Sequence, residues 1–450
     1  MNGLRLASFG VRGFVGESFD PRVAIDFASA FGTFVEGRRI LVGRDTRYSS
    51  DMLHEATVSA LLSCGCEVID FGICPTPVLQ FSVCKWQAEG AISISGGHNA
   101  MGWNALTLIG SDGAYLNPQG GQIVLDVYHA GDFERRRWNG VGELIPESNY
   151  TESYFDALQS FLDVDAIRAA NFKVLIDPVG GAGCSFLKPF AERFGFELVP
   201  VNADPSGYLA REPEPRPRTA RHLGSIIGHV DGSIGFALNS DCSRLSIVTE
   251  AGEPASEEYT MPLIADYVLR KTPGTLVTNT CTTRSVDQVA AQAGVNVVKT
   301  PVGQAHIVAR LIDEQGVIGG EGSGSVVVPS FSRACDAFLM MGLILESMAT
   351  SGQPISKILE GLPRFQIVKR AYECRSDDAY HALERLRQEV NMRVKPEQIS
   401  VIDGVRVDWP EAWVHARTSR TQQRIRIISE AETMAMAEQR NDEIRRLLDL

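Results

Sequence analysis

Short β-rich segments alternate with helix-length segments along most of this 450-residue chain. An apolar run at 38–45 ends in a polar turn, an amphipathic helical pattern follows at 49–65, and a second apolar run spans 66–72. A further helical pattern at 74–86 begins behind a proline. Alternating strands and helices predict a mostly parallel sheet whose two faces are covered by helices.

The same strand–helix–strand unit occurs twice more. A strand at 172–178 precedes a glycine-rich turn at 180–183, and a helical pattern then leads to another strand. The third copy has strands at 274–280 and 295–300 on either side of a helix at 285–294. The glycine-rich turn lacks the G-x-G-x-x-G pattern of a dinucleotide site, so we interpret it as a tight turn. Three such units place most of the chain in the α/β class.

The C-terminal region follows a different pattern. Segments 401–419 and 424–431 predict antiparallel strands, and 431–450 predicts a long terminal helix. Breaks in the pattern divide the chain into four predicted domains. These are three α/β domains with mixed sheets at 1–147, 148–252 and 253–366, followed by a smaller α+β domain at 367–450.

Acidic residues outnumber basic ones, since 55 Asp and Glu against 43 Lys and Arg give a formal net charge of −12. A surface of that sign repels nucleic acid and anionic lipid, so we expect neither as a partner. The chain has no apolar run of about 18 residues, and its first residues do not resemble a signal peptide. Its nine cysteines are scattered, which is typical of reduced, buried thiols. We therefore expect a cytoplasmic protein without a membrane segment.

Two stretches resemble the α-D-phosphohexomutase superfamily, which includes phosphoglucomutase, phosphomannomutase and phosphoglucosamine mutase. FGVRGFVGE at 9–17 resembles the family's opening loop, and 40–83 follows the family pattern closely. The resemblance implies a four-domain fold around a central cleft. It also implies a cycle in which a phosphoserine donates its phosphoryl group to a hexose phosphate, the bisphosphate reorients, and the serine takes back the other phosphate. Such a cycle needs an acceptor oxygen, a metal ion and a proton acceptor.

The acceptor oxygen is missing from the loop that resembles the family's T-A-S-H-N-P. Residues 95–100 read SGGHNA, so Gly97 stands at the phosphoserine position while His98 is retained. Glycine has no side chain that a phosphate can esterify. Ser95 is two residues away, which at the usual strand rise displaces its hydroxyl by roughly 6–7 Å. We keep Ser95 as a candidate substitute nucleophile and His98 as a candidate acid or base.

The loop that resembles the family's D-G-D-A-D-R magnesium loop is also altered. Residues 239–244 read NSDCSR, in which Asn239 and Ser243 replace two aspartates and only Asp241 remains. Hard cations prefer anionic oxygen ligands. We therefore expect at most weak Mg²⁺ binding at Asp241 and no other cofactor.

Two further positions depart from the family, because Thr107 replaces a lysine and Ser325 replaces a histidine. The phosphosugar-binding positions are retained. Glu321 and Ser323 match residues that hydrogen-bond sugar hydroxyls, and 417–426 resembles the family's phosphate loop, where guanidinium and hydroxyl groups hold a phosphate dianion. The remaining candidate phosphosugar contacts are Arg12, Arg244, Lys299, Gly303, Arg417, Ser419, Arg420, Thr421 and Arg426.

These features favour a superfamily protein that binds a phosphorylated hexose or hexosamine but cannot run the phosphoserine cycle, as a pseudoenzyme or a repurposed phosphosugar enzyme. Two alternatives stay open. One is an active intramolecular phosphotransferase with a substitute acceptor, either Ser95 or a supplied bisphosphate. The other is a non-catalytic partner subunit of a true mutase. A homo-oligomer is compatible with each of them.

Overall fold

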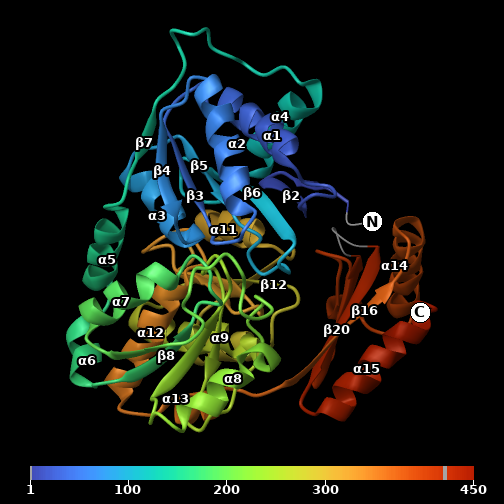
Figure 1. Cartoon of the computed structure of the whole chain (residues 1–450). Helices are drawn as coiled ribbons and strands as arrows, with labels where there is room; N and C mark the ends of the chain where they lie inside the picture. The colour runs from blue at the N-terminus through green and yellow to red at the C-terminus, as the bar shows by residue number, and fades with distance from the viewer. Residues whose placement is uncertain (1–2, 419–422) are drawn as a thin grey trace. The chain divides into compact units, whose positions relative to one another are not determined.

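The chain forms two compact units in a computed structural model that describes residues 3–418 and 423–450 (Figure 1). The first unit comprises Met1–Thr260 and Ser323–Leu359. The second comprises Met261–Gly322 and Glu360–Leu450. Each unit is therefore assembled from two stretches of sequence that are far apart along the chain.

The first sheet of the first unit is a mixed sheet of seven strands. Its strand order is β1-β2-β6-β5-β3-β4-β7, in which β5, β3, β4 and β7 are parallel and β1, β2 and β6 add antiparallel pairs. The strands are β1 (Arg5–Ala7), β2 (Gly10–Phe14), β3 (Ile40–Arg44), β4 (Val68–Ile73), β5 (Gly90–Ile94), β6 (Trp103–Gly110) and β7 (Leu144–Pro146). The helices are α1 (Pro21–Phe34), α2 (Ser50–Ser63), α3 (Thr76–Lys85) and α4 (Pro118–Ala130).

The strand–helix–strand unit predicted over 38–72 is confirmed, since β3 and β4 pair in parallel with α2 between them. Helix α1 packs against both α2 and α4 (Figure 1). Their buried apolar residues, together with those of β3 and β6, form one continuous core. Helix α2 ends at Ser63, two residues before the predicted end, because Cys64 caps it and Gly65 adopts a φ of +85°.

The second sheet of the first unit has the order β11-β10-β8-β9, with β10, β8 and β9 parallel and β11 antiparallel. The parallel β8–β9 pair confirms the unit predicted to begin at 172. The strands are β8 (Lys173–Asp177), β9 (Glu197–Pro200), β10 (Ile234–Leu238) and β11 (Leu245–Val248). The helical elements before and after them are α5 (Tyr150–Phe161), α6 (Val164–Ala169), η1 (Cys184–Phe186), α7 (Leu187–Phe194), α8 (Pro217–Ile227) and η2 (Glu257–Tyr259).

The returning segment of the first unit carries β15 (Ser325–Val327), α12 (Ala337–Ser351) and α13 (Ile355–Glu360). Helix α12 is apolar on all sides and buried over most of its length. Asp336 caps its start by accepting hydrogen bonds from the backbone amides of Phe338 and Leu339, and it also accepts one from the Tyr154 hydroxyl at 2.8 Å. Burial raises the pKa of Asp336 to about 6. The cap and the apolar surface fix this segment in the core of the first unit.

In the second unit, β13, β12 and β14 lie side by side in that order and run parallel. The β12–β13 pair confirms the unit predicted over 274–300. The strands are β12 (Leu276–Asn279), β13 (Val297–Thr300) and β14 (Ile318–Glu321), and the helices are α9 (Thr260–Lys271), α10 (Ser285–Gln292) and α11 (Gln304–Asp313).

The rest of the second unit contains an antiparallel sheet in the order β16-β20-β19-β18-β17. Its strands are β16 (Gln366–Glu373), β17 (Ile399–Ser400), β18 (Val405–Asp408), β19 (Ala412–Thr418) and β20 (Arg424–Ala431). Helices α14 (Ser376–Asn391) and α15 (Met434–Leu447) pack on it, and η3 (Pro396–Gln398) precedes β17. The predicted antiparallel strands and terminal helix are thus confirmed.

Within the residues described, no helix is long and apolar enough to cross a membrane. All nine cysteines are free thiols, of which five are buried and Cys84 is exposed. The prediction of buried thiols therefore holds for five of the nine, since Cys84 is exposed and Cys184, Cys281 and Cys374 are half-buried.

Candidate functional site

The loop at 95–100 follows β5 and is held by hydrogen bonds made within the first unit. The Ser95 hydroxyl donates to Oδ2 of Asp45 at 2.6 Å and accepts from the backbone amide of Gly97 at 2.9 Å. Ser95 is buried. Its hydroxyl therefore supports the loop, and the hydroxyl proton is directed at a carboxylate oxygen of Asp45.

Arg47 lies beneath this loop and is almost fully buried. Its guanidinium forms an ion pair with Asp45 at 3.0 Å and donates to the backbone carbonyls of Gly97 and Asn99 at 3.1 and 2.8 Å. The Ser240 hydroxyl donates to the Gly97 carbonyl as well, at 2.8 Å. Sequence reasoning did not single out Arg47 or Asp45. One signal was available in the sequence. Two opposite charges stand directly after a buried strand, and buried charges need partners within the protein.

Gly97 has a φ of +55°, a left-handed conformation that side chains other than glycine adopt only with strain. A Cβ atom at this position would lie 2.9 Å from Oδ2 of Asp241. That is closer than a carbon atom approaches a carboxylate oxygen without displacing it. The structure thus places the predicted acceptor position beside the one remaining aspartate of the 239–244 loop.

The 239–244 loop follows β10, and its polar groups bond to one another. Asn239 accepts from the backbone amide of Ser243 at 2.9 Å and donates to the Ser243 hydroxyl at 3.0 Å. That hydroxyl donates to Oδ1 of Asp241 at 2.7 Å, and the Ser243 amide donates to the same oxygen at 3.1 Å. Burial raises the pKa of Asp241, while the hydrogen bonds from Ser243 and the charge of Arg244 oppose that rise.

The residues of this loop do not fit the magnesium site that the superfamily implies. Mg²⁺ is bound by carboxylates in near-octahedral geometry, and here a single carboxylate stands beside an amide and a hydroxyl that are bonded to each other. Over residues 3–418 and 423–450, no three His, Cys, Asp or Glu side chains are grouped as metal ligands. Whether Asp241 binds Mg²⁺ weakly stays a prediction.

His98 is surrounded by arginines. The pKa of His98 is lowered well below its usual value, mainly by the positive charge of Arg244, then by burial, and then by Arg12, Arg216 and Arg47. Glu214 bridges two of these cations, at 2.6 Å from Arg216 and 3.3 Å from Arg244. The imidazole is therefore held neutral at physiological pH, in surroundings that favour an anion. Arg216 and Glu214 were not among the predicted residues.

Glu321 and Gly303 are brought together in the second unit. Glu321 ends β14, and its Oε1 accepts from the side-chain amide of Asn279 and from the backbone amide of Gly303, both at 2.9 Å. Gly303 has a φ of +131°. In the first unit, the Ser323 hydroxyl is hydrogen-bonded to that of Ser325 at 2.8 Å.

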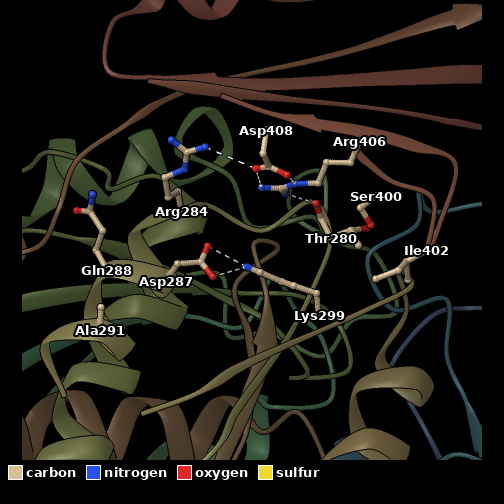
Figure 2. Close-up of a pocket in the computed structure, with 10 residues that line it drawn as sticks. All are labelled: Thr280, Arg284, Asp287, Gln288, Ala291, Lys299, Ser400, Ile402, Arg406 and Asp408. Atoms are coloured by element: carbon tan, nitrogen blue, oxygen red, sulfur yellow. Dashed lines mark hydrogen bonds and ion pairs between the residues drawn. The ribbon is translucent and has the colours of Figure 1, made fainter. Parts of the chain in front are cut away.

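Lys299 lies in a cavity of about 450 Å³ in the second unit (Figure 2). Its ammonium group pairs with Asp287 of α10 at 2.8 Å, and burial lowers the pKa of Lys299 against the opposing effect of that carboxylate. Across the cavity, Asp408 accepts from Arg406 at 2.7 Å and lies 3.5 Å from Arg284. The full lining comprises Thr280, Arg284, Asp287, Gln288, Ala291, Lys299, Ser400, Ile402, Arg406 and Asp408. Of these, only Lys299 was predicted from the sequence.

Arg417 is buried near the end of β19, and its Nε atom has no hydrogen-bond partner among the described residues. Arg426 of β20 is its register partner in the antiparallel pair. Two like charges directly opposite each other destabilise a sheet unless an anion neutralises them. The predicted contacts Ser419, Arg420 and Thr421 lie outside the described residues.

Comparison with known proteins shows that this chain is similar to a family of sugar-phosphate mutases. Models of the phosphoglucomutase/phosphomannomutase alpha/beta/alpha domains I, II and III match residues 6–135, 152–252 and 256–365. The chain therefore belongs to the phosphoglucomutase/phosphomannomutase family, within the α-D-phosphohexomutase superfamily. It has the fold predicted from the sequence, with three α/β/α domains and a fourth, C-terminal domain built on an antiparallel sheet. The predicted domain boundaries stay a prediction.

Individual relatives match almost the whole chain. A Thermococcus kodakarensis protein named "Phosphoglucomutase/phosphomannomutase" is 34% identical over 96% of this chain and 95% of its own length. A Pyrococcus abyssi protein named "Probable phosphoglucosamine mutase" is 31% identical over 95% and 94%. The crystal structure of a phosphoglucomutase/phosphomannomutase family protein from Burkholderia thailandensis has a TM-score of 0.87 at 23% identity and covers 99% of this chain and 98% of its own.

Proposed function

We propose that this protein binds a phosphorylated hexose or hexosamine and does not use a phosphoserine in the 95–100 loop. Gly97 is the observation that carries the second part of the proposal, because it offers no oxygen, and a side chain there would be strained by the left-handed backbone and would meet Oδ2 of Asp241. Ser95 does not replace it readily, since its hydroxyl is buried and bonded to Asp45.

The arginines of the second unit support phosphate binding. The guanidinium of Arg417 has an Nε donor without a partner among the described residues, and it lies opposite Arg426 in the sheet. A buried donor left unpaired costs roughly 1–3 kcal/mol. A phosphate dianion would accept from that donor and neutralise the charge. Glu321, held by Asn279 and Gly303, has a second carboxylate oxygen that suits a sugar hydroxyl.

Isothermal titration calorimetry with glucose 1-phosphate, glucose 6-phosphate, mannose 6-phosphate and glucosamine 6-phosphate tests this proposal. We expect saturable binding of at least one of these ligands and a loss of affinity of at least tenfold in Arg417→Ala. Arg417→Lys keeps the charge and should bind more tightly than Arg417→Ala if the variants fold. Arg393→Ala, which changes an exposed arginine of the same unit, is the matched control and should bind like the wild type.

Two results would contradict the proposal. One is the absence of binding to the wild type at millimolar ligand. The other is equal affinity in the wild type and Arg417→Ala, with both proteins shown to be folded by circular dichroism.

A second candidate function is that of an active mutase with a different phosphoryl acceptor. The names of the relatives favour it, since the Thermococcus kodakarensis and Pyrococcus abyssi proteins are both named as mutases and match nearly the whole chain. A coupled assay for conversion of glucose 1-phosphate or glucosamine 6-phosphate, with and without added hexose bisphosphate, distinguishes it from binding alone. Turnover that rises with added bisphosphate would support this function, and the absence of turnover with every substrate would leave phosphosugar binding as the activity.

A further inference from the structure

We propose that Asp241 is the phosphoryl acceptor of this protein and that its carboxylate takes a phosphoryl group from a bound hexose phosphate as an aspartyl phosphate. The inference rests on the proposed binding of a phosphosugar. It goes beyond that binding because it assigns a covalent role to a residue that the family resemblance assigns only to the metal loop.

The position of the carboxylate is the first argument. Oδ2 of Asp241 lies 2.9 Å from the point where a side chain at residue 97 would begin. An acceptor hydroxyl at residue 97 would be carried by that same carbon atom, so Oδ2 lies beside the place where the resemblance puts the acceptor oxygen. In-line phosphoryl transfer is sensitive to errors of about 1 Å. Oδ2 of Asp241 lies 2.9 Å from that carbon position, whereas no atom of Ser95 lies within 4 Å of it, so Oδ2 is the nearer of the two candidate acceptors.

The orientation of the carboxylate is the second argument. Oδ1 accepts two hydrogen bonds, from the hydroxyl and the backbone amide of Ser243. The backbone carbonyl of Asp241 accepts from the amide of Thr76 at 3.1 Å, which fixes the residue at its main chain. Oδ2 has no hydrogen bond to any residue in 3–418 or 423–450. One oxygen is therefore anchored while the other keeps its lone pairs for a phosphorus atom, and carboxylates of this kind are known nucleophiles.

The surrounding charge is the third argument. A phosphoryl group has to be brought to an anionic nucleophile, so the site must supply positive charge. Arg244 acts on both Asp241 and His98, and Arg12 and Arg216 add further positive charge around His98. Because the loop residues do not form a magnesium site, these guanidinium groups are the charge that the chain itself provides.

The step balances in atoms and electrons. Oδ2 of Asp241 attacks the phosphorus, and a new Oδ2–P bond forms as the bond between phosphorus and the sugar oxygen breaks. The sugar oxygen leaves with the electron pair of that bond and takes a proton from water. In the reverse direction, a hydroxyl of the sugar attacks the aspartyl phosphate, loses its proton to water, and regenerates the carboxylate.

Chemical trapping tests the inference on the full-length protein. The protein is incubated with glucose 1,6-bisphosphate, quenched in acid, reduced with borohydride and digested. Borohydride converts an aspartyl phosphate to homoserine, so we expect homoserine at position 241 by peptide mass spectrometry, and a phosphate label that hydroxylamine removes. This mapping uses the wild type and does not depend on a variant folding.

Variants then separate the roles of the loop residues. Asp241→Asn should lose the label completely while it still binds the sugar phosphate by calorimetry. Ser243→Ala removes the hydroxyl that orients Oδ1 and should slow labelling at least tenfold without moving the label to another residue. Asp165→Asn, which changes an almost fully exposed aspartate of the same unit, should label like the wild type.

Three outcomes would overturn the inference. A hydroxylamine-resistant phosphate, or a label mapped to Ser95, would place the acceptor on a hydroxyl. No label on a protein that binds the phosphosugar would remove the acceptor role and leave the proposed function intact. No binding of any hexose phosphate or bisphosphate would overturn both proposals together.

Discussion

The loops around Gly97 in the first unit and the region around Arg417 in the second unit differ in how their polar groups are satisfied. In the first, the polar side chains are hydrogen-bonded to one another and to the Gly97 carbonyl, so they have partners within the protein without a ligand. These side chains are Ser95, Asp45, Arg47 and Ser240. In the second, the Nε donor of Arg417 is buried without a partner among the described residues.

The two regions therefore differ in what a ligand would add to each of them. Around Gly97, the supporting groups are bonded within the first unit, while Oδ2 of Asp241 has no hydrogen bond among the described residues. Around Arg417, a buried cation keeps one donor without a partner among the described residues, and we expect a bound phosphate to accept from it. Four substitutions can break or sharpen this comparison, and they follow in order of decreasing expected effect.

Arg47→Met should lower the free energy of unfolding by about 3–5 kcal/mol, because it leaves the buried Asp45 charge without its partner. Urea denaturation measures the effect. Arg38→Met, at an exposed arginine, is the control and should change stability far less, because solvent screens its ion pairs. Equal effects of the two variants would show that the ion pair between Arg47 and Asp45 does not stabilise the 95–100 loop.

His415→Gln should flatten the acid side of the stability curve. Burial lowers the pKa of His415 to about 4, from an unperturbed value near 6.5. A depressed pKa means that His415 contributes stability above pH 6.5, and this contribution is lost as the pH falls from about 6.5 to about 4. The loss amounts to about 3 kcal/mol on the usual conversion.

The measurement for His415→Gln is the unfolding free energy at a series of pH values between 4 and 7.5. The wild type should lose more stability over this window than the variant does. The exposed His381→Gln variant is the control and should follow the wild type. Parallel curves for the wild type and His415→Gln would contradict the prediction.

Gly97→Ser should not restore a mutase cycle and should lower stability by about 1–3 kcal/mol, because the serine would adopt a left-handed φ and meet Oδ2 of Asp241. Gly131→Ser is the matched control, with a φ of +68° and no atom within 4 Å of the new Cβ. Adding Asp241→Ala to Gly97→Ser should recover part of the loss if the contact is responsible. Phosphorylation of the introduced hydroxyl in the Gly97→Ser variant, with full turnover, would refute this account.

Glu321→Gln should have the smallest effect on folding, about 1 kcal/mol, because the amide oxygen still accepts from Asn279 or Gly303 but without the charge. If the second carboxylate oxygen of Glu321 accepts from a sugar hydroxyl, Glu321→Gln should weaken ligand binding more than it weakens folding. Thermal unfolding and calorimetry on the same samples compare the two. A variant that loses stability but keeps full affinity would assign Glu321 a structural role.

Much of the fold could be predicted from the sequence because its signals are local. The parallel pairs β3–β4, β8–β9 and β12–β13 follow from apolar runs separated by helical periodicity, and the antiparallel β19–β20 pair follows from alternation. These features depend on side chains within a few positions of each other.

The candidate site was predictable only in part. The identities of Gly97, Asn239 and Ser243 show which groups are lost, and a glycine excludes a phosphoserine whatever the fold. No spacing in the sequence indicates that Arg47 would lie under Gly97, that Arg216 would act on His98, or that Lys299 would pair with Asp287.

The sequence by itself determined the order of strands and helices and the chemical groups available at each loop, since both are properties of consecutive residues. Only the tertiary structure decided which of those groups meet. Asp241 lies next to Gly97 although they are far apart along the chain, because β5 and β10 end where their loops can touch. Contacts at such separation are set by the packing of whole sheets and helices, and no local pattern of residues encodes them.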